Sequence, residues 1–363
     1  MSHAPAEWLL EFAAAAAMTD QFTEKPNHVA LLAAGLIGEA GSVVAELKKK
    51  HRELAAYPAY RNRMLEEVGD FLWYYARLVS VLAPQLLYEL QDTQKPAEHT
   101  SSGSHLSAFL RFGVAVGDVL RSITTDSGTN DASPPLRRIW DSLTGVSREV
   151  NISLREAAES NKQKTSNRWP KIKKYTKLFD EEFPEEEQLP RLLRIEFRER
   201  SRGGQKAVIL RCNGINFGDR LTDNIEDPDG YRFHDIFHFA HAVHLGWSPV
   251  VRALLRSKRK SQPDVDEAQD GARAAIIEEA VAAIVFSRAK QLNFFNELQR
   301  VDLDLLKLVS EFVEGFEVAA IPMWQWEIAI LDGYRVFRLL RDSGGGLVTL
   351  DLAQRQLKFD PLS

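Results

Sequence analysis

Apolar residues recur at three- and four-residue spacing from residue 8 to about residue 90, which is the pattern of helices that bury one face. Tyr57-Pro58 interrupts this pattern, because proline disfavours the helical conformation in the residue before it. Helical spacing resumes at 105–123 and at about 135–161, and the polar stretches between the helices, 91–104 and 124–135, indicate loops. The first half of the chain is therefore predicted to form a bundle of four or five antiparallel helices.

The pattern changes after an acidic, proline-containing stretch at 179–190, which suits a linker better than a core. Apolar and β-branched residues flank Gly203-Gly204 and predict a β-hairpin near 193–212. Helical spacing then returns from residue 231 to about 341, and residues 344–352 suit a short strand or an extended tail. We expect a mainly α protein with a helical N-terminal domain, 1–180, and a mostly helical C-terminal domain with one small hairpin, 187–363.

Composition indicates a folded, globular protein. Hydrophobic residues make up 44% and charged residues 27%, so the chain can bury cores of ordinary size, and 363 residues favour two of them. The single cysteine, Cys212, excludes an intrachain disulfide, and no secretory signal is recognised, so we expect a cytoplasmic protein. No window approaches the roughly 18 uninterrupted apolar residues of a membrane span, and we expect no membrane partner.

A net charge of −5 gives the chain no general attraction to phosphate polymers, which does not favour nucleic-acid binding. The one basic patch, Arg256 to Lys260, is interpreted as a solvated helix end or as a local phosphate contact.

Two predicted helices of the first domain carry acids at spacings that suit a metal ion. Glu39 and Glu46 are seven residues apart, so they differ by only ~20° around the helix axis. Glu67 and Asp70 are three apart and share a face. Glu39, Glu67 and Asp70 border apolar stripes, where a charge without a partner is costly. Mg²⁺ prefers oxygen ligands. The alternative is that these acids are solvated surface residues that form weak ion pairs.

Three segments resemble the two metal-binding helices of MazG-like nucleotide pyrophosphohydrolases: GLIGEAG at 35–41, ELKK at 46–49 and EEVGDFLW at 66–73. The series Asn161, Lys164 and Arg168 resembles the basic segment that closes that domain. The family pattern has Glu-x-x-Glu on one helix and Glu-x-x-Asp on the next, and Ser42 stands where the second glutamate is expected. Serine brings no charge, so Glu46 is the predicted replacement ligand.

The resemblance implies an all-α enzyme that hydrolyses a nucleoside or deoxynucleoside triphosphate to the monophosphate and pyrophosphate. It implies Mg²⁺, with Mn²⁺ as the alternative ion, and a homodimer or higher homo-oligomer. The metal and catalytic residues would be Glu39, Glu46, Glu67 and Asp70. The substrate-binding residues would be Lys49, Asn161, Lys164 and Arg168.

A histidine cluster marks the second domain. On a helix, His234, His238 and His241 fall within an arc of ~60°. Together with Asp235 and with Glu278 or Glu279 from the predicted helix 272–290, they could bind zinc or another transition metal. The alternative is a set of histidines hydrogen-bonded in the core. With this cluster and with Asp270 and Arg273, the domain resembles the helical extension found after some MazG-like domains.

Three functional hypotheses follow. The first is a nucleotide pyrophosphohydrolase with a C-terminal accessory domain. The second is a nucleotide-binding sensor in which Ser42 weakens catalysis. The third places the activity in the second domain, because His234-Asp235 resembles the His-Asp pair of some metal phosphohydrolases. The sequence contains no phosphate-binding P-loop motif that would indicate an ATPase and no nucleophile elbow that would indicate an esterase.

Overall fold

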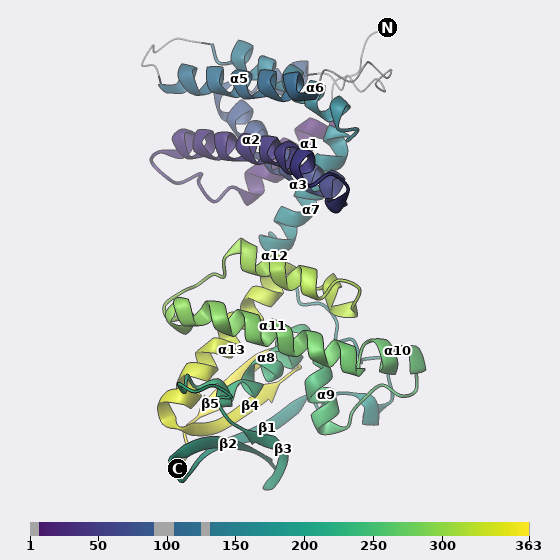
Figure 1. Cartoon of the computed structure of the whole chain (residues 1–363), viewed down its shortest axis with the longest axis vertical. Helices are drawn as coiled ribbons and strands as arrows, with labels where there is room; N and C mark the ends of the chain where they lie inside the picture. Colours follow the sequence, from purple (N-terminus) through teal and green to yellow (C-terminus); the bar gives the residue numbers. More distant parts are fainter. Residues whose placement is uncertain (1–6, 91–104, 125–130, 363) are drawn as a thin grey trace. The chain divides into compact units, whose positions relative to one another are not determined.

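The computed structural model describes residues 7–90, 105–124 and 131–362. It is mostly helical, with one five-stranded antiparallel sheet (Figure 1), which confirms the prediction of a mainly α protein. The chain divides into two compact units, Met1–Lys171 and Ile172–Ser363, each with its own hydrophobic core. The acidic stretch predicted as a linker belongs to the second unit, where Asp180 is buried.

The described part of the first unit is a helical bundle. Its helices are α1 (Glu7–Thr19), α2 (His28–Glu53), α3 (Tyr60–Leu82), α4 (Leu86–Glu89), α5 (His105–Thr124), α6 (Ser133–Glu149) and α7 (Leu154–Arg168), with the 3-10 turn η1 (Leu54–Ala56). Helix α3 is central, because α1, α2 and α7 all contact it. Its residues Val68, Phe71 and Leu72 are fully buried, as their spacing predicts. The predicted loop 91–104 and residues 125–130 of the predicted loop 124–135 lie outside the described residues.

The prediction of one helix over about 135–161 is wrong, because the structure contains two helices there. Asn151 has a left-handed backbone with φ of 52°, which ends α6. Ser153 then caps α7 by accepting a hydrogen bond from the Glu156 amide. The sequence contains this signal, since Ser153 and Glu156 form the S-x-x-E pattern of a capping box. Apolar residues on both sides of the break concealed it.

Helix α2 lies within a segment, His28–Ala56, that is long and apolar enough to cross a membrane by length and composition alone. In the structure it packs Leu32, Leu36 and Val43 into the core of the bundle. Core helices of helical bundles pass the same test of length and composition, so this feature is weak evidence for a membrane span.

The second unit contains the sheet. Its strands are β1 (Leu192–Arg202), β2 (Gln205–Cys212), β3 (Ile215–Leu221), β4 (Gly345–Asp351) and β5 (Gln356–Asp360), in the order β3-β2-β1-β4-β5. The hairpin predicted near 193–212 is present as β1 and β2, with Phe197 opposite Leu210. The C-terminal residues predicted as a strand or tail form β4, which places Gly346 opposite Phe197 on the other side of β1. The predicted hairpin is thus part of a larger sheet.

Helices of the second unit cover this sheet. They are α8 (Asp235–Leu245), α9 (Pro249–Leu255), α10 (Pro263–Ala268), α11 (Ala272–Gln291), α12 (Leu303–Phe312) and α13 (Met323–Ser343), with the 3-10 turns η2 (Glu185–Glu187), η3 (Tyr231–Phe233), η4 (Asn293–Phe295) and η5 (Glu317–Ala320). Helices α8 and α13 pack against each other and against β4 and β5, and α11 also contacts α8. Every residue of α8 is buried.

The ends of α8 and α9 follow the sequence signals. Gly246 terminates α8 in the left-handed conformation, with φ of 69°. Ser248 caps α9 by accepting a hydrogen bond from the Val251 amide, and Pro249 occupies the first helical position. These two caps fix the direction of the chain immediately after the histidine cluster.

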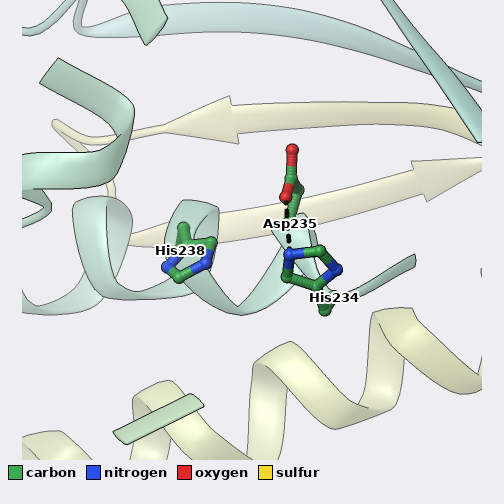
Figure 2. A group of neighbouring side chains, drawn as sticks. All are labelled: His234, Asp235 and His238. Carbon is green, nitrogen blue, oxygen red and sulfur yellow. Dashed lines mark ion pairs between the residues drawn. The ribbon is translucent and has the colours of Figure 1, made fainter. Parts of the chain in front are cut away.

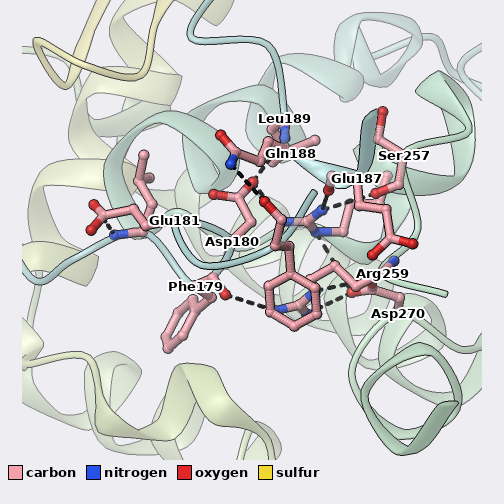
Figure 3. Close-up of polar contacts among 12 residues, drawn as sticks. Phe179, Asp180, Glu181, Glu187, Gln188, Leu189, Ser257, Arg259 and Asp270 are labelled. Carbon is pink, nitrogen blue, oxygen red and sulfur yellow. Dashed lines mark hydrogen bonds and ion pairs between the residues drawn. The ribbon is translucent and has the colours of Figure 1, made fainter. Parts of the chain in front are cut away.

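A buried network of ion pairs connects distant parts of the second unit (Figure 3). Arg252 pairs with Asp180 at 2.9 Å, and Arg259 pairs with Asp270 at 2.7 Å and with Glu317 at 2.6 Å. Arg259 is 1% exposed, so the basic patch predicted from Arg256 to Lys260 is interrupted by an arginine that points into the core. The patch is therefore not a continuous basic surface.

Candidate functional site

Three of the predicted acids converge in the first unit. Glu39 on α2 and Glu67 and Asp70 on α3 each place a carboxylate oxygen within 4.8 Å of the other two. All three residues are half-buried, which leaves the group accessible while limiting its hydration. Carboxylates this close repel one another when ionised, so the arrangement favours a cation among them.

Glycines at two crossings let the helices approach closely enough to form this group. A Cβ at Gly35 would lie 2.1 Å from the ring of Tyr74, so only glycine allows α2 to meet α3 there. A Cβ at Gly69 would lie 2.6 Å from the carbonyl oxygen of Ala157, so Gly69 is needed where α3 meets α7. The positions of Glu39, Glu67 and Asp70 depend on the first contact, and the contribution of α7 depends on the second.

Helix α7 brings two predicted substrate-binding residues to Asp70. The side-chain amide of Asn161 donates a hydrogen bond to Oδ1 of Asp70 at 2.6 Å. Lys164 forms an ion pair with Asp70 and lies 3.5 Å from Glu66. Oδ1 of Asn161 is buried and has no hydrogen-bond partner among the described residues. A buried acceptor of this kind is costly unless a donor or a cation reaches it.

The structure does not bring Glu46 or Lys49 into this group. Glu46 is 2% exposed, accepts a hydrogen bond from the Tyr57 hydroxyl and pairs with Lys49. Burial and the neighbouring Glu46 carboxylate raise the pKa of Tyr57 to about 12, so the phenol remains a donor. The position of the expected ligand is occupied by Ser42, which is half-buried and one turn from Glu39.

Arg168, the fourth predicted substrate-binding residue, lies at the end of α7 with its guanidinium 4.9 Å from the ring centre of Trp169. Sequence reasoning missed Tyr74, whose pKa is raised by burial and by the nearby carboxylates of Glu39 and Asp70. Its spacing of four residues from Asp70 was the signal, because residues four apart on a helix are neighbours.

The histidines of the second unit form two adjacent groups that share His238. In one, potential ligand atoms of His234, Asp235 and His238 lie within 4.8 Å of one another (Figure 2). In the other, His238 and His241 meet Glu278. His244 lies outside both groups, with Nε2 2.8 Å from Asp332. The predicted cluster of His234, His238 and His241 is therefore divided between two groups, with His238 in both.

Glu278 is the centre of the second group. It is fully buried, and its oxygens accept hydrogen bonds from the Ser248 hydroxyl and the Val250 amide, both at 3.0 Å. Burial alone would raise the pKa of Glu278, but His238 and His241 outweigh it and lower the pKa to about 2. Glu278 is thus a charged acceptor that organises the cluster. Sequence reasoning left the choice between Glu278 and Glu279 open, and both face His238, at 3.1 Å and 3.3 Å.

The first unit is a helical bundle in which two neighbouring helices bring three carboxylates together, and the second is a helical unit built on a small sheet. These features define a mainly α protein of two units with a candidate metal site in the first. The family model of the MazG C-terminal domain matches residues 174–363, which is more than half of the chain. The chain therefore belongs to this family and is a MazG-like protein with a MazG C-terminal domain. No curated protein and no solved structure gave a significant match to the chain. The family match does not include the acids of the first unit, so their interpretation rests on their own geometry.

Proposed function

We propose that the first unit hydrolyses nucleoside triphosphates, or their deoxy forms, between the α- and β-phosphates in a metal-dependent reaction. The observation that supports this most directly is the convergence of Glu39, Glu67 and Asp70 within 4.8 Å. Family membership supports a nucleotide-related role in the same direction. The proposal requires acids on two helices that lie close enough to bind one cation together. The spacing of Glu39, Glu67 and Asp70 supports this requirement.

The donor set suits Mg²⁺, with Mn²⁺ as an alternative, because both are hard ions that take oxygen ligands. Lys164 pairs with Asp70, one of the three carboxylates of this group. When bound, such an ion neutralises phosphate charge and lowers the pKa of a coordinated water. Asn161 keeps Asp70 in place, and its Oδ1, which has no hydrogen-bond partner in the described part of the chain, offers one further oxygen beside the acids.

We propose that Lys164 exchanges its partner during the reaction. Without substrate it neutralises Asp70, and with an ion on the carboxylates its charge becomes available to a phosphate of the nucleotide. Arg168, further along α7, is the proposed second phosphate contact because its guanidinium can bind two oxygens at once. Lys49 is paired with Glu46 and has no part in this proposal.

We also propose that the active form is a homodimer. Leu106, Leu110 and Val114 recur every four residues along α5 and are 59%, 60% and 66% exposed. Such a stripe on a helix is the kind of apolar surface that a second copy would cover.

The decisive experiment measures pyrophosphate release from each nucleoside triphosphate with Mg²⁺. Glu67→Gln keeps the size of the side chain and removes one charge, so we expect it to abolish release, with about a 100-fold loss or more. Glu53→Gln changes an acid on α2 outside the group and serves as the matched control. Unchanged release in Glu67→Gln would overturn the proposal.

A binding-only sensor is the second candidate, and Ser42 is the observation that favours it, because it removes one expected carboxylate. Nucleotide binding measured by calorimetry, without pyrophosphate release under any metal, would support this candidate. Loss of release in His238→Ala with normal release in Glu67→Gln would instead place the activity in the second unit.

A further inference from the structure

The first histidine group of the second unit has the arrangement of a metal site. His234 precedes α8, Asp235 begins it and His238 follows one turn later, so all three come from one short segment. Figure 2 shows the imidazole of His234 beside the carboxylate of Asp235, with the ring of His238 nearby. Helix α11 adds Glu279, whose Oε2 lies 3.3 Å from Nε2 of His238. Two imidazoles and one carboxylate therefore lie within 4.8 Å of one another, and a second carboxylate lies beside His238.

The ring of His234 is oriented as a ligand would be. Its Nδ1 lies 2.9 Å from the carbonyl oxygen of Tyr231, and a carbonyl can only accept, so Nδ1 carries the proton. In the neutral ring Nε2 then has a free lone pair, yet it lies 3.2 Å from Oδ1 of Asp235. Two electron-rich atoms at that distance need a proton or a metal ion between them. Metal-binding histidines commonly donate their other N–H to a backbone carbonyl in this way.

The ring of His238 lies between two carboxylates, those of Glu278 and Glu279. It is fully buried, and neither ring nitrogen makes a hydrogen bond of acceptable geometry with a described residue. Its Nδ1 nevertheless lies 3.1 Å from Glu278, and its Nε2 3.3 Å from Glu279. Ligand atoms at roughly 2.0–2.2 Å from one ion lie about 3.0–3.4 Å from one another. The separation between Nε2 and Glu279 has this value.

Glu278 is a positioning residue for this group. Its oxygens already receive hydrogen bonds from Ser248, Val250 and His241. This leaves it beside Nδ1 of His238 as a fixed carboxylate, which orients the ring with Nε2 toward Glu279. Carboxylates behind a metal-binding histidine have this function.

We propose that Nε2 of His234, Asp235, Nε2 of His238 and Glu279 bind one divalent transition-metal ion in the second unit. Imidazole ligands suit zinc, cobalt, nickel or iron, whereas Mg²⁺ prefers an all-oxygen set such as the acids of the first unit. The side chain of Glu279 is 45% exposed, so an ion can enter from its side. The site is independent of the proposed hydrolysis.

The test uses Co²⁺ as the probe, because its visible absorption reports nitrogen and oxygen ligands. The full chain is stripped with a chelator, dialysed against Co²⁺ and then against metal-free buffer, and bound cobalt is measured by mass spectrometry. We expect one Co²⁺ per chain with visible bands in the wild type and in Glu67→Gln, which has a disrupted first-unit group. We expect Glu279→Gln and His234→Ala to raise the Kd by more than about tenfold.

His244→Gln is the matched control on the same helix, since His244 contacts Asp332 and not the proposed site. Glu279→Gln changes a partly exposed side chain, so loss of the ion in this variant cannot be attributed to a collapsed core. Equal cobalt content and equal spectra in wild type, Glu279→Gln and His234→Ala would overturn the site. So would a wild type that retains no cobalt, which would leave His238 as a protonated partner of the two glutamates.

Discussion

The side-chain amide of Asn161 donates a 2.6 Å hydrogen bond to Asp70, which lies 91 residues earlier in the chain. This contact joins α7 to α3 and connects the basic end of the first unit to its acids. It is possible because Gly69, next to Asp70, has no side chain to hold α7 away. The geometry of the proposed active site therefore depends on a residue that has no chemistry of its own.

Gly69→Ala is expected to destabilise the first unit. The new Cβ would lie 2.6 Å from the Ala157 carbonyl, so backbone must move, at a cost of about 1–3 kcal/mol. This exceeds the roughly 1 kcal/mol that alanine gains over glycine within a helix. Gly145→Ala on α6 is the control, because no atom lies within 4 Å of its Cβ, and it should stabilise slightly. Urea unfolding followed by circular dichroism measures both, and equal midpoints would contradict the prediction.

Ser42→Glu is expected to strengthen the proposed ion site. It restores a carboxylate one turn from Glu39, and we expect the Mg²⁺ concentration for half-maximal pyrophosphate release to fall by about tenfold. Ser42→Gln has the same length without the charge and should leave the Mg²⁺ dependence unchanged. If both variants behave alike, the charge at this position does not limit metal binding.

Asp180→Asn is expected to destabilise the second unit strongly. Asp180 and Arg252 are each 1% exposed in their side chains, and they pair at 2.9 Å. Removing the charge of Asp180 leaves Arg252 buried with only the more distant Asp270 carboxylate, at 3.6 Å, beside it, and breaking such a pair costs about 3–5 kcal/mol. Glu181→Gln, at the next and exposed position, is the control and should change stability little. A difference in unfolding free energy below about 1 kcal/mol would show that Asp270 compensates for the lost charge.

The effect of Asp180 should also depend on pH. Burial alone would raise the pKa of Asp180, but the ion pair with Arg191, the Leu189 amide and the charge of Arg252 lower it. A lowered pKa means that its stabilisation is fully present above the unfolded pKa of about 4 and is lost as the pH falls through the folded pKa. The difference in urea midpoint between wild type and Asp180→Asn should therefore be full at neutral pH and shrink in acid. A difference that widens in acid would contradict this assignment.

Leu110→Glu should convert the proposed homodimer to a monomer. A charge in the centre of the exposed stripe on α5 would be buried without a partner when two copies associate. Light scattering after size exclusion should give twice the chain mass for the wild type and one chain mass for the variant. Leu54→Glu alters a leucine that is 65% exposed and outside the stripe, and it should remain dimeric. A monomeric wild type would remove this proposal.

Local signals predicted many elements of the fold. The spacing of apolar residues identified α2, α3 and α5, and the pair Gly203-Gly204 identified the first hairpin. The sequence prediction missed the break between α6 and α7 although Ser153 and Glu156 form a capping-box pattern there. The helical spacing of apolar residues continued on both sides of the break and concealed it. The enlargement of the hairpin by β4 was not predictable locally, since it pairs strands more than 140 residues apart.

The candidate sites were also predicted only in part from local signals. Glu39 and Glu46 share a helix face, but seven residues span about 10.5 Å along the axis, so direction alone did not place both at one ion. Tyr57 and Lys49 instead engage Glu46. Between Glu278 and Glu279, the sequence offered two neighbouring acids, and the rotation of α11 gave them different roles beside His238.

The sequence by itself determined which segments are helical, which faces they bury and which of them carry acids or histidines, because these properties follow from spacing and from residue chemistry. Only the tertiary structure decided how closely the helices approach and which side chains meet. Those contacts depend on steric fit between residues far apart in the chain, as where Gly69 admits α7 and Lys164 reaches Asp70. Such fit is a property of the packed pair and of neither helix alone.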